Sequence, residues 1–436
     1  MRMSSSIRFR RLSIFCAATL LVAGAAPAAT SANDYQVGSY YTGWSVDKGF
    51  RLKQFDRSPA ADGFTFLVYA FENVYPMPDG SHRCDSGRDV PDRDGAGMRA
   101  TLDYARRFGA DESVDGSADQ PGQPLAGNFH QLAQLKARRP NLKVLVALGG
   151  GEWSRWFAQG AATEKGRRAL VSSCIDLYLR GNLPRLDGHG GPGAAAGVFD
   201  GIDLDWEHPG PADKGNFTLL VQELRRQLDA LGKETGKRYL LTAAVNSTDE
   251  KMRHTEPAVY SRSLDWINLM TYDFNGAWKA QGPTGFQSNL YPDPASKDAS
   301  PRSVDTGVKR FLAAGVPPEK IVVGVPFYAR GWRGVAPANN GLYQPAQGAA
   351  RGFEEGAEEY ARIAARKLPG QYHPVARQWW TYADGTFWTY DDPRVIEEKA
   401  GYVRTRRLGG LMSWALDQDD AAFSLSRAMT TVRRAP

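Results

Sequence analysis

Cysteine is scarce in this chain, with only three in 436 residues. A small scaffold held together mainly by disulfides is therefore excluded, and the 42% hydrophobic content is enough for a substantial core instead. Cys16 lies in an apolar segment near the N-terminus, so Cys84 and Cys174 are the two that remain if that segment is removed. In an oxidising compartment they would form one disulfide or stay as two free thiols, and the sequence leaves both alternatives open.

Long hydrophobic runs are absent beyond the first residues, so no bilayer-spanning segment and no membrane partner are expected. The chain starts with four arginines, an apolar run from Leu12 to Ala26 and small residues at Ala26 to Ala28. This pattern predicts a signal peptide over residues 1–28. We therefore expect a secreted protein, either extracellular or periplasmic.

A strong excess of one charge is also missing. The formal net charge is +6, but the predicted signal peptide holds four arginines and no acid, so the mature chain carries about 6 − 4 = +2. Nucleic acid is therefore not an expected partner. The six histidines are scattered, which argues against a metal-dependent deacetylase, and no G-x-G-x-x-G fingerprint follows the first predicted strand. We expect neither a metal nor another cofactor.

Short β-rich runs recur through the mature chain and alternate with helical patterns. Eight such runs begin at Tyr35, Phe64, Lys143, Val198, Tyr239, Trp266, Ile321 and Gly409. Helices are predicted between them over residues 129–139, 167–183, 217–231, 304–314 and 393–406. Eight alternating units predict an α/β fold of the (β/α)8 TIM-barrel type rather than an open doubly wound sheet.

Two segments are longer than the barrel needs. Residues 72–127 are rich in Asp, Gly and Pro and are expected to form a long, partly mobile loop on the active face. Residues 332–390 lie between the seventh strand and its helix and contain a helical stretch and an aromatic, β-like run. They predict a small inserted α+β subdomain. The barrel would then consist of residues 34–331 and 391–436.

Carboxylates alternate near the end of the fourth predicted strand, in the run Asp200-Gly-Ile-Asp-Leu-Asp-Trp-Glu207. Because side chains in a strand alternate between faces, Asp203, Asp205 and Glu207 share one face, about 6 to 7 Å apart, and point into the barrel. Their crowding is expected to raise the pKa of Glu207 enough for general-acid catalysis. A buried ion network or a divalent-metal site is the alternative, but neither requires a position at a strand end.

The same D-x-x-D-x-D-x-E run resembles the catalytic signature of the family 18 glycoside hydrolases. GSYYTGW from Gly38, LMTYDFNGAW from Leu269, GVPFYARGW from Gly324 and the stretch from Tyr390 to Asp420 resemble the chitinases of that family, in the same order. The insertion after the seventh strand is typical of their deep-cleft subfamily. The resemblance implies a secreted, monomeric enzyme that hydrolyses β-1,4-linked N-acetylglucosamine in chitin or chitooligosaccharides.

In that family the N-acetyl oxygen of the substrate is the nucleophile, and the reaction retains the anomeric configuration. The resemblance implies that Glu207 protonates the leaving oxygen and that Asp205 stabilises the positive intermediate. It also implies that Asp203 pairs with Asp205, that Tyr272 donates to the acetamido oxygen, and that Asp200 is structural. Sugar-contacting roles are implied for Asp273, Trp414, Tyr328, Arg330, Tyr40, Phe71, Trp153 and Trp278, with Trp332 as a further candidate.

Two positions depart from the family pattern. Gly151 stands where many relatives have a tryptophan, so one stacking platform on the leaving-group side is missing. His208 follows Glu207 at a position that is often aromatic, and we expect it to be structural.

Two other functions compete with chitin hydrolysis. One is a sugar-binding lectin on an inactive barrel, although such relatives typically lack the terminal glutamate that Glu207 provides. The other is an endo-β-N-acetylglucosaminidase that acts on N-glycans. The inserted subdomain and the many aromatic residues favour linear chitin over N-glycans.

Overall fold

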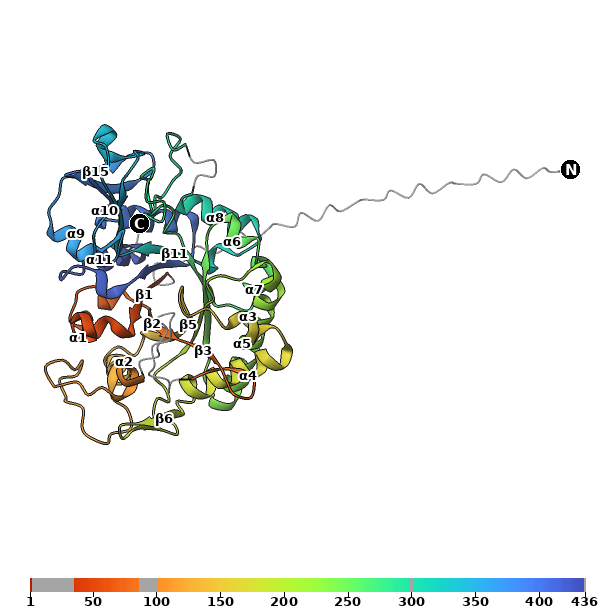
Figure 1. Ribbon diagram of the computed structural model, residues 1–436. Helices are drawn as coiled ribbons and strands as arrows, with labels where there is room; N and C mark the ends of the chain where they lie inside the picture. Colours follow the sequence, from red (N-terminus) through yellow and green to blue (C-terminus); the bar gives the residue numbers. More distant parts are fainter. Residues whose placement is uncertain (2–34, 86–99, 298–301, 435–436) are drawn as a thin grey trace.

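Eight parallel strands close into a barrel in the computed structural model, which describes residues 1, 35–85, 100–297 and 302–434. Neighbouring strands follow the order β1-β18-β11-β10-β9-β8-β5-β2. Their bounds are β1 Gln36–Thr42, β2 Phe66–Glu72, β5 Lys143–Gly149, β8 Gly201–Asp205, β9 Leu240–Asn246, β10 Trp266–Met270, β11 Ile321–Pro326 and β18 Gly410–Trp414. These strands fall within the eight predicted runs, and the TIM barrel is confirmed (Figure 1). The predicted signal peptide lies almost wholly outside the described residues.

Helices surround the barrel, and the longer ones pack against it with an apolar stripe. In α5 (Lys214–Thr235), Phe217, Leu220, Val221 and Leu224 are buried at helical spacing, and the helix ends at Gly236 in the left-handed conformation. The other helices are α1 Leu52–Asp56, α2 Gly127–Arg138, α3 Phe157–Ala161, α4 Glu164–Cys174, α6 Asp249–Met252, α7 Pro257–Tyr260, α8 Val304–Ala313, α10 Pro393–Arg406 and α11 Ser424–Thr430.

Strand β8 divides its side chains between two environments. Ile202 and Leu204 are fully buried in the layer between the barrel and the helices. Asp203 and Asp205 belong to the opposite face, which points into the barrel interior. Aromatic and aliphatic side chains from other strands, including Tyr40 and Phe66, fill that interior. The acids are thus held in an otherwise largely apolar lumen.

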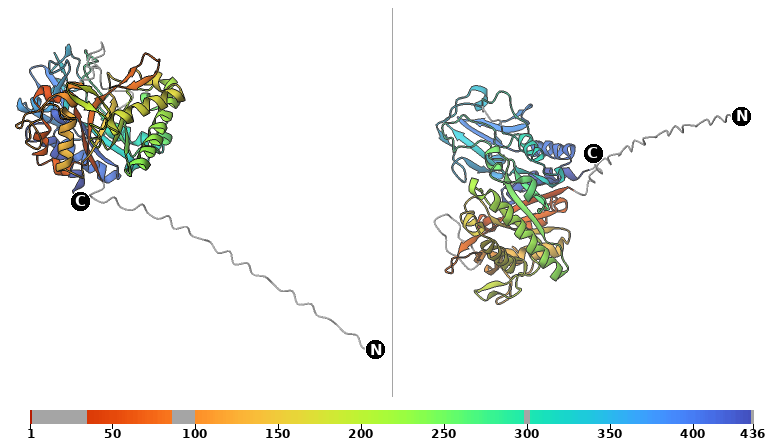
Figure 2. Two further views of the ribbon diagram at one scale, coloured as in Figure 1. Left: turned by 90° about the horizontal axis from the view of Figure 1, so that it is seen from below. Right: turned by 90° about the vertical axis from the view of Figure 1, so that its right-hand side faces the viewer.

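The predicted insertion is a separate antiparallel sheet that stands against one side of the barrel (Figures 1 and 2). Its main strand order is β13-β12-β17-β16-β15, with β14 paired to β12. The elements are β12 Tyr328–Arg333, β13 Gly348–Ala349, β14 Ala357–Glu359, α9 Tyr360–Ala365, β15 Gly370–His373, β16 Gln378–Ala383 and β17 Thr386–Tyr390. The sheet begins at Tyr328, before the predicted boundary at residue 332, because only Phe327 separates β11 from β12.

The long segment after β2 forms a hairpin, β3 (Val74–Pro76) and β4 (His82–Cys84), and a short helical turn at Thr101–Ala105. A disulfide joins Cys84 to Cys174, with their Cα atoms 5.0 Å apart, so the hairpin is fastened to the end of α4. Of the two alternatives that the sequence left open, one disulfide or two free thiols, the structure shows the disulfide. A second hairpin consists of β6 (Leu183–Leu186) and β7 (His189–Gly191). Residues 86–99, which belong to the predicted loop, lie outside the described residues.

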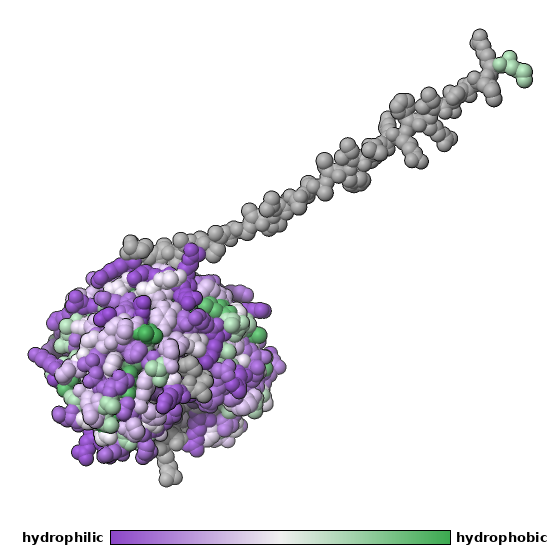
Figure 3. Space-filling model, turned by 90° about the horizontal axis from the view of Figure 1, so that it is seen from above, coloured by the Kyte–Doolittle hydropathy of each residue, from purple (hydrophilic) through white to green (hydrophobic). Residues whose placement is uncertain are grey.

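Hydrophilic residues cover most of the face seen in Figure 3, and the hydrophobic ones are scattered over it. No helix within the described ranges is both long and apolar enough to span a membrane.

Candidate active site

A cleft of about 490 Å³ opens at the carboxyl ends of the barrel strands. Residues that follow six of these strands line it, and the insertion supplies part of its wall. Active sites of TIM barrels lie at this end because the loops after the strands converge there. Most of the predicted site residues line the cleft, namely Tyr40, Phe71, Trp153, Asp205, Glu207, Tyr272, Asp273, Tyr328, Arg330 and Trp414.

Asp203 lies at the bottom of the carboxylate row and is fully buried. Its Oδ2 accepts a hydrogen bond from the Tyr40 hydroxyl at 2.7 Å, and its Oδ1 accepts from Asn268 Nδ2 at 3.0 Å and from the Thr242 hydroxyl. Burial raises the pKa of Asp203, whereas these three donors act in the opposite direction. Asp203 is therefore held in place by three protein hydrogen bonds, below the next acid along the strand.

Asp205 and Glu207 occupy the next two positions on that face. Burial and the charges of Glu207 and Asp203 raise the pKa of Asp205 well above its usual value, and its Oδ1 has no partner among the described residues. Burial, with repulsion from Asp273, raises the pKa of Glu207 to about 7. Two interacting carboxyl groups in this position hold a shared proton near neutral pH, as a general acid requires.

The backbone beside Glu207 is fixed by a serine from the loop after β5. Glu207 N donates to Ser154 Oγ at 2.8 Å, and Ser154 Oγ lies 2.8 Å from Gly150 O and 3.0 Å from Asp205 O. This loop approaches β8 closely, since a Cβ on Gly149 would lie 2.1 Å from Asp205 O. Gly149 and Gly150 also have positive φ values, 112° and 96°. Both positions thus favour glycine, which at 149 lets the loop lie against β8 and at 150 leaves room for the Phe71 ring.

Aromatic side chains form a continuous surface in the cleft. The rings of Phe71 and Trp414 stack with their centroids 5.3 Å apart, and Phe71 and Trp153 lie 5.5 Å apart. Trp153 stacks in turn on Trp44 at 5.5 Å with an interplanar angle of 8°. Trp44 ends the GSYYTGW segment but was not among the predicted site residues. Flat apolar faces of this kind suit the faces of pyranose rings.

Polar groups stand on the side of the cleft nearest the insertion. Arg330 makes a bidentate pair with Asp273, at 2.7 and 3.0 Å, and its guanidinium lies over the rings of Tyr328 and Trp278 at 5.0 and 5.5 Å. Trp278 itself is 55% exposed and lies at the rim rather than among the lining residues. The pair fixes the Asp273 carboxylate at the mouth of the cleft.

Tyr272 lies between the carboxylates and this pair. Its ring packs at 6.2 Å against Tyr328, and burial raises the pKa of its hydroxyl well above the usual value. A Cβ at Gly324 would come within 2.8 Å of the Tyr272 ring. The lack of a side chain at this position in the neighbouring strand β11 therefore leaves room for the ring. The phenol therefore remains a proton donor at any physiological pH.

Trp332 is an incorrect site prediction. Its side chain is 1% exposed, packs at 5.9 Å against Phe387 and donates from Nε1 to Lys279 O at 3.0 Å. It belongs to the core of the insertion, where Phe286 and Trp380 join Phe387 in the same hydrophobic cluster.

Asp200, by contrast, has structural contacts only. Its Oδ2 accepts from Val144 N at 2.8 Å and pairs with Lys136 at 2.9 Å, outside the cleft.

His208 and Gly151 lie next to Glu207. His208 Nε2 is 3.6 Å from Glu207 Oε2, and burial lowers the pKa of His208 to about 4, so the ring is neutral at neutral pH. The ring lines the cleft, and the structural role expected for it stays a prediction. A Cβ on Gly151 would meet only Glu207 Oε1, at 4.0 Å, so the missing side chain leaves open space beside the acid.

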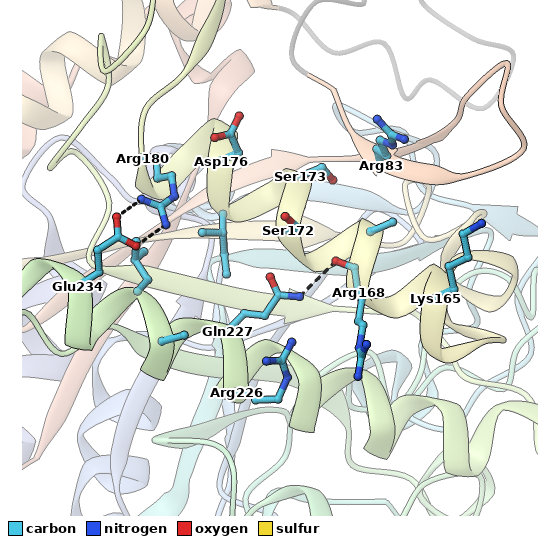
Figure 4. A pocket seen from close by; sticks show the side chains of 14 residues that line it. Arg83, Lys165, Arg168, Ser172, Ser173, Asp176, Arg180, Arg226, Gln227 and Glu234 are labelled. Atoms are coloured by element: carbon cyan, nitrogen blue, oxygen red, sulfur yellow. Dashed lines mark hydrogen bonds and ion pairs between the residues drawn. The ribbon is translucent and has the colours of Figure 1, made fainter.

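A second hollow, of about 870 Å³, lies outside the barrel between α4 and α5 (Figure 4). Arg180 pairs there with Glu234 at 2.5 Å, Arg226 with Glu223 and Arg168 with Glu164. These arginines are neutralised by carboxylates of the chain itself. Five basic side chains and only two acidic ones, Asp176 and Glu234, line the hollow, and it lacks the buried acids and stacked aromatic rings of the cleft.

Comparison with known proteins agrees with this geometry. The family model described as "Glycosyl hydrolases family 18" matches residues 36–419. Chitinase A1 of Niallia circulans is 32% identical over 433 residues, and Chitinase C of Streptomyces lividans is 34% identical over 391 residues. The matches cover 90% and 88% of this chain, which spans 57% of the length of each relative.

Among solved structures, the catalytic domain of psychrophilic chitinase B from Arthrobacter TAD20 superposes with a TM-score of 0.87 at 37% identity. That match covers 94% of this chain and 98% of the other.

Proposed function

Since the chain belongs to glycosyl hydrolase family 18, we propose that it is a secreted chitinase that hydrolyses β-1,4-linked N-acetylglucosamine polymers with retention of configuration. The observation that carries the proposal is the row Asp203, Asp205 and Glu207, which ends at a carboxyl group with a pKa of about 7 inside an aromatic cleft. The names of the chitinases from Niallia circulans and Streptomyces lividans support the same substrate class.

Each acid has a separate task in the proposed reaction. Protonated Glu207 gives its proton to the glycosidic oxygen as that bond breaks, and the acetamido oxygen of the same sugar attacks the anomeric carbon. The resulting oxazolinium ion is positive, and Asp205, whose Oδ1 lacks a protein partner, accepts the acetamido N–H and offsets the charge. Glu207 then removes a proton from the attacking water, which restores its starting state.

Tyr272 and Trp414 position the reacting sugar. The Tyr272 hydroxyl donates to the acetamido oxygen and aligns it for attack, while the Trp414 ring supports the sugar from below. Asp273, fixed by Arg330, accepts from sugar hydroxyls. The hydrogen bonds to Asp203 leave this carboxylate charged enough to hold the shared proton on the Asp205–Glu207 pair.

The first experiment replaces the proton donor. Glu207→Gln should lower the rate of chitotetraose hydrolysis by about 10²-fold to 10⁴-fold or more, because the transferable proton is lost, while binding of the oligomer is kept. Glu234→Gln, at a glutamate on the outer surface of α5, is the matched control and should retain full activity. Near wild-type turnover by Glu207→Gln would refute the role of the acid.

The second experiment identifies the nucleophile and separates the competing substrates. If the acetamido oxygen attacks, partly deacetylated chitosan must be cut only after acetylated units, and fully deacetylated polymer must be inert. Sequencing of the fragments checks this, and frequent glucosamine at new reducing ends would contradict it. Asp205→Asn should then lower kcat far more than affinity. Release of oligosaccharide from an N-glycoprotein, with chitin untouched, would instead favour an endo-β-N-acetylglucosaminidase.

A further inference from the structure

A lysine connects three cleft-forming segments on the side of the barrel opposite Glu207. Lys48 ends the short 3-10 helix that follows β1, at Gly43–Lys48. Its Nζ lies 3.2 Å from Asp417 Oδ2, in the loop after β18, and 3.0 Å from Glu359 Oε1, in the insertion. In the closed strand order β18 stands four positions from β8, so this cluster faces the catalytic acid across the cleft.

The two carboxylates differ in how far they depend on this lysine. Glu359 has a second cationic partner, Arg362, at 3.1 Å. The Asp417 side chain is only 1% exposed, and its Oδ1 has no hydrogen-bond partner in the described part of the chain. Within the described part of the chain, the ion-pair partner of Asp417 is therefore Lys48. Breaking such a buried pair leaves an uncompensated charge, which costs far more than breaking a surface pair.

The ammonium group also faces the cleft. Lys48 and Asp417 both line it, the side chain of Lys48 is 32% exposed, and its Nζ lies 5.3 Å from the centre of the Phe353 ring. A lysine ammonium has three N–H donors. Two are engaged by the carboxylates, so one remains for an oxygen atom in the cleft.

The aromatic surface leads from the reacting position towards this lysine. Phe71 connects Trp414, which lies at the catalytic centre, to Trp153 and Trp44. Trp44 belongs to the same 3-10 helix as Lys48. Trp44 and Lys48 both line the cleft, so a sugar chain stacked on these rings beyond the reacting position comes to the helix that carries Lys48.

We propose that Lys48 is a positioning residue that holds the β18 loop and the insertion together at this side of the cleft, and that its third N–H binds an oxygen of a sugar unit beyond the one that reacts. The inference rests on the proposed chitinase activity and adds a determinant of substrate length. Short substrates that do not reach Lys48 are unaffected by its contact, whereas long ones gain affinity from it.

The test compares Lys48→Met with wild type on chitotriose and chitohexaose, with kcat and KM measured separately. We expect KM for chitohexaose to rise about tenfold, with kcat nearly unchanged and chitotriose affected less than about twofold. Lys48→Arg keeps the charge and should restore most of the affinity for the long substrate. Lys53→Met, at a partly exposed lysine whose Nζ bonds to the carbonyls of Ala110 and Asp111, is the matched control.

A folding defect is distinguished by the double variant Lys48→Met/Asp417→Asn, which removes both charges and relieves the uncompensated carboxylate. This variant should fold like wild type and still show the selective rise in KM for chitohexaose. Equal losses on both oligomers, or no loss on chitohexaose, would overturn the inference about Lys48. A wild-type protein that cleaves neither oligomer would instead refute the proposed function.

Discussion

The raised pKa of Glu207 lowers the stability of the folded protein at neutral pH, and Glu207→Gln should recover that stability. The pKa rises from 4.5, the value of an ordinary glutamate, to about 7. A shift of roughly 2.5 units at 1.36 kcal/mol per unit corresponds to about 3 kcal/mol between the folded and unfolded states. The side chain is 23% exposed, so screening by water removes only part of this amount.

The sign of the effect depends on pH. Below about pH 4 the carboxyl group of residue 207 is protonated in both the folded and the unfolded state. Its ionisation then makes little difference to the stability of wild type relative to Glu207→Gln. Between pH 4.5 and 7 the folded state binds more protons than the unfolded state, and the stability of wild type falls as pH rises. Above pH 7 the full difference of about 3 kcal/mol should favour the glutamine variant.

Thermal unfolding of both proteins from pH 4 to 8.5 measures this difference. Glu234→Gln is the control, since Arg180 lowers the pKa of the exposed Glu234, and its removal should bring no stabilisation that grows with pH. A stability difference between wild type and Glu207→Gln that is the same at pH 4 and pH 8, or that shrinks as pH rises, would contradict the raised pKa of Glu207.

Three further predictions follow from the same geometry. Because Glu207 must be protonated to act, kcat/KM should fall as pH rises through about 7, and a flat alkaline limb of the pH–rate profile would contradict this assignment. Gly151→Trp should strengthen chitotetraose binding by about 1 kcal/mol, measured calorimetrically in the Glu207→Gln background. Unchanged or weaker binding in a folded variant would mean that Trp153 already fills that place. Replacing Cys84 and Cys174 by serine should lower stability by about 4 kcal/mol, because the disulfide closes a loop with a sequence separation of 90. Equal melting temperatures of the variant and oxidised wild type would exclude this.

Local sequence patterns predicted the features that depend on neighbouring residues. The alternation of acids from Asp203 to Glu207 is local, because a strand has a side-chain period of two, and it was sufficient to assign one face to carboxylates. The eight β-rich runs and the helical stripes between them depend on equally short-range patterns, and they predicted the TIM barrel. The residue motifs also identified ten of the side chains that line the cleft.

Only the tertiary structure decided which distant side chains meet. The register of the closed barrel brings Tyr40, Thr242 and Asn268, from three other strands, onto Asp203, and no local pattern contains that information. Alternation along β12 puts Trp332 on the same face as Tyr328 and Arg330, but distant side chains of the insertion cover it, so its aromatic character alone was misleading. The joining of Lys48 to Asp417 requires the first and last strands of the barrel to be neighbours, which is a property of closure rather than of sequence.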